Sequence, residues 1–350
     1  MADQALQELI EALAALPATK DPHDLDGRRR RARETSDQLV ERFGAAPAPV
    51  AAVEEHVITS EAAQVRVRLY RPFEAGLRPA HLYIHGGGFW LGSPDERAVD
   101  AWCRDRCSRA GVVVAAVDYR LAPEFPYPAG LEDCFAALTW LHRSATELGI
   151  DAGNLSVGGM SAGGNLSAAL ALLTHARGGP ALRLQVLEVP VLDLTLASVR
   201  AAATRRGPGI DLTVADLEEC RDFYLSDPAD ATLGTVSPLS AADVSTMPAT
   251  LILTGGRDLL HEEGAALAAR LRTSSVPVTH VVHEDGVHGS ICLTATWEPA
   301  MRWQDQVVQA LRDGLAPDAE PPASRTEPMT PASPDPALQA SARHSQGGNE

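Results

Sequence analysis

Short apolar runs alternate with amphipathic segments through most of this chain. Runs with the length and β-branched content of strands lie at 65–71, 81–85, 112–117, 155–159, 184–189, 250–254 and 278–283. Segments with helical spacing of apolar residues lie at 94–110, 131–147, 162–176 and 262–273. Strand and helix in repeated order predict an α/β fold, with a mainly parallel sheet covered by helices on both faces.

The pattern changes at three places. Residues 1–50 have helical spacing, with Leu6, Ile10, Leu13 and Leu16 on one face, and we expect the arginines at 28–31 and 33 to form a solvated helix face. The segment 44–52 has the composition of a linker. Residues 194–235 contain no clear strand but a helix-like stretch at 214–225, which indicates an insertion or lid over the sheet. We therefore expect a helical N-terminal region (1–50), one catalytic domain (51–315) with this insertion, and a disordered Pro- and Ser-rich tail (316–350).

Composition narrows the class of protein. The 350 residues carry a formal net charge of −16, which disfavours a nucleic-acid partner. No apolar stretch is long enough to span a membrane, and the N-terminus does not resemble a secretory signal. Five scattered cysteines favour the reducing cytoplasm without a disulfide framework. Cys103 and Cys107 are one helical turn apart but have no further ligands nearby, so we interpret them as buried small residues and expect no metal.

Residues 159–163 read Gly-Met-Ser-Ala-Gly, a G-x-S-x-G motif placed between a predicted strand and a predicted helix. This strand–turn–helix context is typical of a nucleophile elbow, whose flanking glycines allow strand and helix to approach closely. The motif alone is also compatible with an ordinary tight turn. The helix N-terminus would favour developing negative charge beside Ser161.

A second glycine-rich segment, His85-Gly-Gly-Gly-Phe-Trp90, directly follows a predicted strand. Three consecutive glycines leave backbone amides uncovered, and such amides can bind an oxyanion. The adjacent aromatic residues Phe89 and Trp90 argue against a merely flexible loop. An HGGG-type loop together with a serine elbow is typical of lipases and esterases.

A nucleophilic serine needs a base, and the base needs an orienting acid. Asp258 is the first acid after the strand at 250–254, and His288 lies between glycines after the strand at 278–283. This order, Ser, acid, His, is the one that the α/β-hydrolase arrangement uses. His283 is the competing base, and Asp285 and Glu262 are the alternative acids.

Seven motifs together carry a resemblance to the hormone-sensitive-lipase-like branch of α/β-hydrolase esterases. They are HGGGFW (85–90), YRLAPE (119–124), FPYPAGLED (125–133), GMSAGGN (159–165), VPVLD (189–193), GGRDLL (255–260) and GVHG (286–289). The resemblance implies an eight-stranded, mainly parallel sheet, a helical cap that includes the N-terminal region, and no cofactor. It also implies Ser161 as nucleophile, Asp258 as acid and His288 as base. Oxyanion donors would come from the glycine loop (Gly86, Gly87 and Gly88, chiefly the last two) and from the amide of Ala162.

Three positions depart from the family pattern. Met160 replaces the usual acidic residue before the nucleophile, Leu259 replaces a frequent proline after the acid, and Ser290 replaces an aromatic residue after the base. We expect these changes to alter the pocket or the pH preference rather than the triad.

The resulting hypothesis is a serine carboxylesterase that acts on short- to medium-chain esters through an acyl-enzyme. Phe89, Trp90, Met160, Phe223 and Tyr224 are expected to shape the substrate pocket, although Phe223 and Tyr224 could equally pack the insertion onto the core. The same triad could serve a lactone, an amide, an acetylated natural product or acyl transfer to an alcohol. A ligand-binding protein on a hydrolase scaffold is the alternative outside the enzymes. Members of this family are often dimers, so a homodimer is a further alternative for the oligomeric state.

Overall fold

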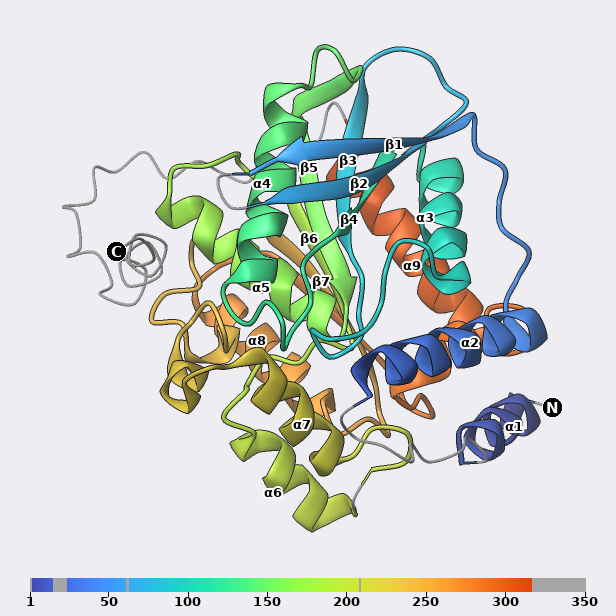
Figure 1. Cartoon of the computed structure of the whole chain (residues 1–350). Helices are drawn as coiled ribbons and strands as arrows, with labels where there is room; N and C mark the ends of the chain where they lie inside the picture. The colour runs from blue at the N-terminus through green and yellow to red at the C-terminus, as the bar shows by residue number, and fades with distance from the viewer. Residues whose placement is uncertain (1, 15–23, 61–62, 208, 317–350) are drawn as a thin grey trace.

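The chain is built around one eight-stranded sheet (Figure 1). The computed structural model describes residues 2–14, 24–60, 63–207 and 209–316. The strand order is β1-β2-β4-β3-β5-β6-β7-β8, in which β2 runs antiparallel to both neighbours and all pairs from β4 to β8 are parallel. The strands are β1 (Ala52–Thr59), β2 (Gln64–Arg71), β3 (Arg78–Ile84), β4 (Val113–Asp118), β5 (Ile150–Met160), β6 (Leu184–Glu188), β7 (Ala249–Gly255) and β8 (Val278–His283). This topology confirms the expected α/β fold with an eight-stranded, mainly parallel sheet.

Helices cover both faces of the sheet, and each face has its own apolar core. Successive residues of a strand point to opposite faces, so Leu82 joins the core under α4 and α5, whereas Tyr83 joins the core under α3 and α9. The helices are α1 (Ala2–Ala14), α2 (Leu25–Phe43), α3 (Arg97–Ala110), α4 (Ala129–Arg143), α5 (Ala162–Ala176), α6 (Ala197–Arg206), α7 (Val214–Tyr224), α8 (His261–Thr273) and α9 (Glu298–Gly314). Three short 3₁₀ helices, η1 (Pro228–Thr232), η2 (Pro238–Ser240) and η3 (His288–Cys292), complete the regular structure.

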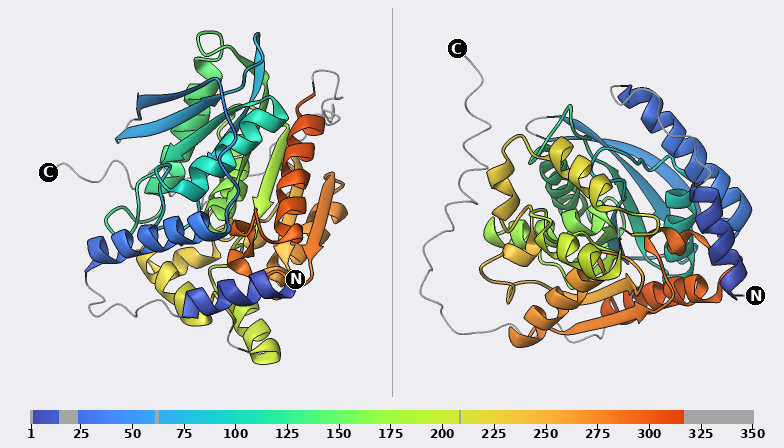
Figure 2. Two further views of the ribbon diagram at one scale, coloured as in Figure 1. Left: turned by 90° about the vertical axis from the view of Figure 1, so that its right-hand side faces the viewer. Right: turned by 90° about the horizontal axis from the view of Figure 1, so that it is seen from below.

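The insertion at 194–235, called the cap segment below, contains α6, α7 and η1 and no strand. Helix α7 matches the expected helix at 214–225, whereas the pattern did not reveal α6, in which only Val199 and Ala202 are buried. Figures 1 and 2 show α6 and α7 grouped with α2 at one end of the sheet. The parallel strands that precede the predicted site residues end on this side.

The edge strand β1 was not expected, because 44–52 was interpreted as a linker and 53–59 was given no element. Its sequence, AVEEHVIT, includes two glutamates and a histidine, and most of its side chains are partly or fully exposed. An edge strand of this kind lacks the apolar run that marked the buried strands. Helix α3 likewise begins at Arg97 and not at Pro94.

The N-terminal region differs from expectation in one respect that bears on function. Arg28 and Arg29 do not lie on a solvated face, because their side chains are only 11% and 23% exposed. Arg28 pairs with Glu219 of α7, and Arg29 contacts the carbonyl oxygens of Trp90 and Ala122. The arginine run therefore joins α2 to the glycine loop and to the cap segment.

Helix α1 buries Leu6 and Leu9 against a small cluster that includes Phe43, Val287 and Trp297. The side chain of Leu13, residue Leu16 and the expected tail from 317 onward lie outside the described residues. In the part of the chain that is described, no helix is long and apolar enough to cross a membrane.

Candidate active site

Ser161 occupies a strained turn between β5 and α5. Its backbone has φ 56° and ψ −116°, an unusual conformation for a residue with a side chain. The flanking glycines are sterically required, since a Cβ atom at Gly159 or Gly163 would lie 2.2 Å or 2.0 Å from the carbonyl oxygen of Ile84. The amide of Ser161 donates to the carbonyl of Glu188 at the end of β6 (2.8 Å). Both neighbouring strands thus hold this serine in place.

The structure brings Ser161, His288 and Asp258 together from three separate loops. The Nε2 atom of His288 lies 3.0 Å from the Oγ of Ser161, and its Nδ1 lies 2.8 Å from Oδ2 of Asp258. The second carboxylate oxygen of Asp258 accepts the amide of Leu260 (3.0 Å), which orients the carboxylate. With the proton on Nδ1 donated to Asp258, Nε2 is free to accept the hydroxyl proton of Ser161.

The electrostatic setting of His288 favours its protonated form. Burial alone would lower the pKa of His288, but the charge and hydrogen bond of Asp258, together with the charge of Asp211, outweigh it and raise this pKa above its ordinary value. An imidazole with a raised pKa is a stronger base toward the serine hydroxyl.

The alternative base, His283, and the alternative acids, Glu262 and Asp285, lie away from Ser161. The ring of His283 packs on Trp303, with centroids 4.7 Å apart, and its Nε2 contacts Gln306. Glu262 pairs with Arg205 on the surface, and Asp285 is exposed. None of the three contacts Ser161 or His288.

Two of the departures from the family pattern have structural roles. Ser290 is buried and donates its hydroxyl to the carbonyl of Val287 (2.8 Å), which closes the turn that carries His288. Leu259 is buried in the core beside the cap segment. Met160, which is half-buried, places its thioether methyl group near Gly86.

The glycine loop is tightly anchored. The ring of His85 stacks on Tyr119 (4.3 Å) and its Nδ1 contacts the carbonyl of Gly86 (2.8 Å), while the carbonyl of Gly87 accepts the amides of Trp90 and Leu91. Gly87 and Gly88 have φ values of 115° and 59°, which glycine adopts without strain. Within the described residues, the amides of Gly87, Gly88 and Ala162 donate to no backbone carbonyl, so they are free to bind an oxyanion.

Four aromatic residues join this loop to the cap segment. Phe89 stacks on Tyr224, and Trp90 meets Phe223 edge to face at 5.3 Å. Phe89, Trp90 and Tyr224 are buried in the main core and Phe223 is partly buried. Tyr224 therefore packs the cap segment onto the core, whereas Phe223 packs against Trp90 and keeps part of its surface exposed.

Sequence reasoning missed two groups beside the site. Asp211 of the cap segment accepts hydrogen bonds from the amides of His288 (3.1 Å) and Gly289 (2.5 Å). Behind the elbow, Glu188 forms a fully buried ion pair with Arg106 and accepts the indole N–H of Trp303. No local sequence signal marks either contact, because the partners are far apart along the chain.

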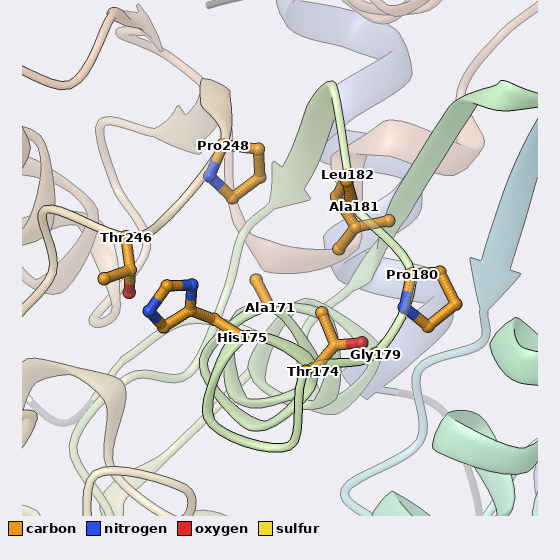
Figure 3. Close-up of a pocket in the computed structure, with 10 residues that line it drawn as sticks. Ala171, Thr174, His175, Gly179, Pro180, Ala181, Leu182, Thr246 and Pro248 are labelled. Atoms are coloured by element: carbon orange, nitrogen blue, oxygen red, sulfur yellow. The ribbon is translucent and has the colours of Figure 1, made fainter. Parts of the chain in front are cut away.

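The remaining features are separate from this site. Among the described residues, no group of three His, Cys, Asp or Glu side chains could hold a metal ion. A cavity of about 380 Å³ is lined by residues that include Thr174, His175 and Pro248 (Figure 3). Thr174 and His175 lie at the C-terminal end of α5, about 20 Å from Ser161 at the rise of an α-helix, so this cavity is separate from the Ser161 site.

Comparisons with known proteins agree with this geometry. The family described as having the alpha/beta hydrolase fold matches residues 81–292, more than half of the chain. The carboxylic ester hydrolase LipN of Mycobacterium tuberculosis is 37% identical over 74% of this chain and 69% of its own length. The ethyl acetate hydrolase of Pseudomonas putida is 35% identical over 89% of this chain and 98% of its own. The solved hyperthermophilic esterase of the archaeon Pyrobaculum calidifontis superposes with a TM-score of 0.82 at 33% identity, covering 88% of this chain and 96% of that one. This chain therefore belongs to the α/β-hydrolase family, in its hormone-sensitive-lipase-like branch of esterases.

Proposed function

We propose that this protein is a serine carboxylesterase that uses Ser161 as nucleophile, His288 as general base and Asp258 as the orienting acid. The observation that carries the proposal is the continuous chain of contacts from Ser161 through His288 to Asp258, on a strained turn beside free loop amides. The relatives with esterase names support the same reaction class.

The proposed reaction has two steps. His288 takes the hydroxyl proton as the Oγ of Ser161 bonds to the ester carbonyl carbon, and the amides of Gly87, Gly88 and Ala162 bind the resulting oxyanion. The intermediate collapses, the C–O bond to the alcohol breaks, and His288 returns the proton to the departing alcohol. His288 then takes a proton from water as the water oxygen bonds to the acyl carbon. The acyl C–O bond to Ser161 breaks, His288 returns the proton to the Oγ of Ser161, and the carboxylic acid is released.

We propose that the acyl chain of the ester substrate is short to medium in length. Stacked, buried rings close the space between the glycine loop and the cap segment on the side of Phe89 and Tyr224. Phe223 and Met160, which are both only partly buried, stay as candidates for contact with substrate. The cytoplasm is the proposed location, supported by five cysteines that are all free.

The test is hydrolysis of p-nitrophenyl esters, from acetate to laurate, by the wild type and by Ser161→Ala. We expect a rate that peaks at a short or medium chain and is abolished in the variant. A serine-directed phosphonate should label Ser161 in the wild type, with the adduct located by peptide mass spectrometry. Parallel lactone and anilide panels decide the reaction class: turnover of amides but not esters would refute the esterase assignment, and no labelling of Ser161 would indicate a binding protein.

A further inference from the structure

The carboxylate of Asp211, in the cap segment, binds the loop that carries His288, the proposed base. Both oxygens of Asp211 are engaged: Oδ1 accepts the amide of His288 (3.1 Å) and Oδ2 accepts the amide of Gly289 (2.5 Å). The loop accommodates this approach because Gly289 has no side chain, and a Cβ atom there would lie 3.1 Å from Oδ2. Paired bonds of this kind fix a peptide in both position and orientation.

Asp211 precedes a helix that is anchored at both ends. It lies in the connection between α6 and α7, just before Thr213, whose capping box with Asp216 starts α7. At its other end α7 carries Tyr224, which is stacked on Phe89 of the glycine loop. The cap segment is thus attached to the core at two places. Tyr224 contacts the glycine loop, and Asp211 binds the loop that carries His288, called the base loop below.

We propose that Asp211 is a positioning residue, whose carboxylate holds the backbone of His288 so that the imidazole stays aligned between Ser161 and Asp258. This inference rests on the proposed function, since it assigns Asp211 a part in the same acyl transfer. It also couples the cap segment to the reaction, because withdrawal of Asp211 would remove both hydrogen bonds to the base loop.

The charge of Asp211 acts on the base as well. The groups that face His288 are Asp258 from the loop after β7, Asp211 from the cap segment and the hydroxyl of Ser161 before α5. The groups that face Asp211 are His288, Asp258 and the thiol of Cys292 in η3. Burial raises the pKa of Asp211, and the nearby His288 partly offsets that rise. Met160, next to Ser161, carries no charge. Asp258 and Asp211 are therefore the charged groups that raise the pKa of His288.

The test compares Asp211→Asn with Asp222→Asn, a control that removes an exposed carboxylate of α7, paired with Arg221, in the same cap segment. An asparagine at 211 is nearly isosteric but lacks the charge, and its N–H₂ group cannot accept one of the two amides. We expect kcat to fall by about 10- to 100-fold with a smaller change in KM, as for a misaligned base. The acidic limb of the pH profile of kcat/KM should move to lower pH, because a negative charge that faces His288 has been removed. Asp222→Asn should leave the limb in place.

A second readout does not depend on turnover. The imidazole of His288 is titrated by NMR in the wild type, in Asp211→Asn and in Asp222→Asn, after thermal unfolding has shown that each variant is folded. A lower His288 pKa in Asp211→Asn alone supports the proposal. An unchanged titration and an unchanged acidic limb in Asp211→Asn overturn it. If the wild type hydrolyses no ester, the proposed function fails, and the titration still decides whether Asp211 acts on His288.

Discussion

Phe89 and Tyr224 stack face to face, with ring centroids 3.9 Å apart and planes only 9° from parallel. Phe89 belongs to the glycine loop, where it adopts a left-handed φ of 69°, and Tyr224 is the last residue of α7. A non-glycine residue stays in that conformation only where its surroundings compensate the strain. The stack therefore connects the cap segment to the geometry of the glycine loop.

Replacing Tyr224 by alanine should lower both the stability of the fold and the activity. We expect the free energy of unfolding to fall by about 3 kcal/mol or more, as for other buried aromatic deletions, and kcat/KM to fall because the loop loses its support. Denaturant unfolding and ester hydrolysis measure the two effects. Tyr224→Phe is the matched control: the hydroxyl is buried without a hydrogen-bond partner among the described residues, so its removal should cost nothing. Equal losses in both variants would contradict a role for the stacked ring.

Arg29 is the second residue whose replacement should affect segments that are distant along the chain. It binds Glu124 through two nitrogens (2.7 Å each) and donates to the carbonyls of Trp90 and Ala122. We expect Arg29→Ala to lower the free energy of unfolding by about 1.5–3 kcal/mol, the usual range for hydrogen bonds to charged groups. Arg29→Lys should recover little, since an ammonium group cannot reproduce the planar fork.

Arg30 provides the control for this measurement, because it lies on the same helix but is exposed. Arg30→Ala should leave stability and kcat/KM within error of the wild type. Equal stability of the alanine variants at 29 and 30 would show that α2 is not held through its arginine run.

Gly88 is packed under the cap segment. A Cβ atom at this position would lie 2.3 Å from the Sγ of Cys220, and its φ of 59° disfavours any other residue. Gly88→Ala should therefore displace the loop and lower kcat by about 10-fold or more, because small misplacements of reacting groups are costly. In Gly88→Ala/Cys220→Ala the steric part of the loss should be recovered, leaving the backbone strain. A double-mutant cycle measures this coupling, and strictly additive effects would argue against the contact.

The pH profile follows from the raised pKa of His288. The protonated imidazole cannot accept the proton of Ser161, so kcat/KM should fall as the pH drops through a value above about 6.5, the ordinary pKa of histidine. In Asp258→Asn the main source of the raised pKa is lost, and the acidic limb should move to lower pH. The same variant should lose about 10⁴-fold in kcat, because the imidazole tautomer is no longer set. Glu262→Gln, which alters a surface acid paired with Arg205, should change neither quantity.

Much of the fold and of the candidate site could be predicted because each depends on local sequence. The buried strands are short apolar runs, and α5 begins and ends where its spacing predicts. Gly159 and Gly163 mark the elbow, since only glycine fits against the carbonyl of Ile84. The order of Ser161, Asp258 and His288 along the chain follows the order of strands in the sheet, and the structure brings the three side chains together.

What escaped prediction lacked such local marks. The edge strand β1 exposes much of its surface, so its pattern does not differ from that of a polar loop. Helix α6 lacks an apolar face of ordinary width. Arg28 and Arg29 look like any other run of solvated arginines until their partners in α7 and in the loops are known.

The sequence by itself determined the buried strands of the sheet, the elbow and the residue types able to perform acyl transfer, because those depend on periodicity and on steric demands within a few residues. Only the tertiary structure decided that Asp211 faces the base loop, that Tyr224 supports Phe89 and that Arg29 holds the glycine loop. These contacts join segments distant along the chain. Their existence depends on how the cap segment and α2 pack on the sheet, and no local pattern of residues encodes that packing.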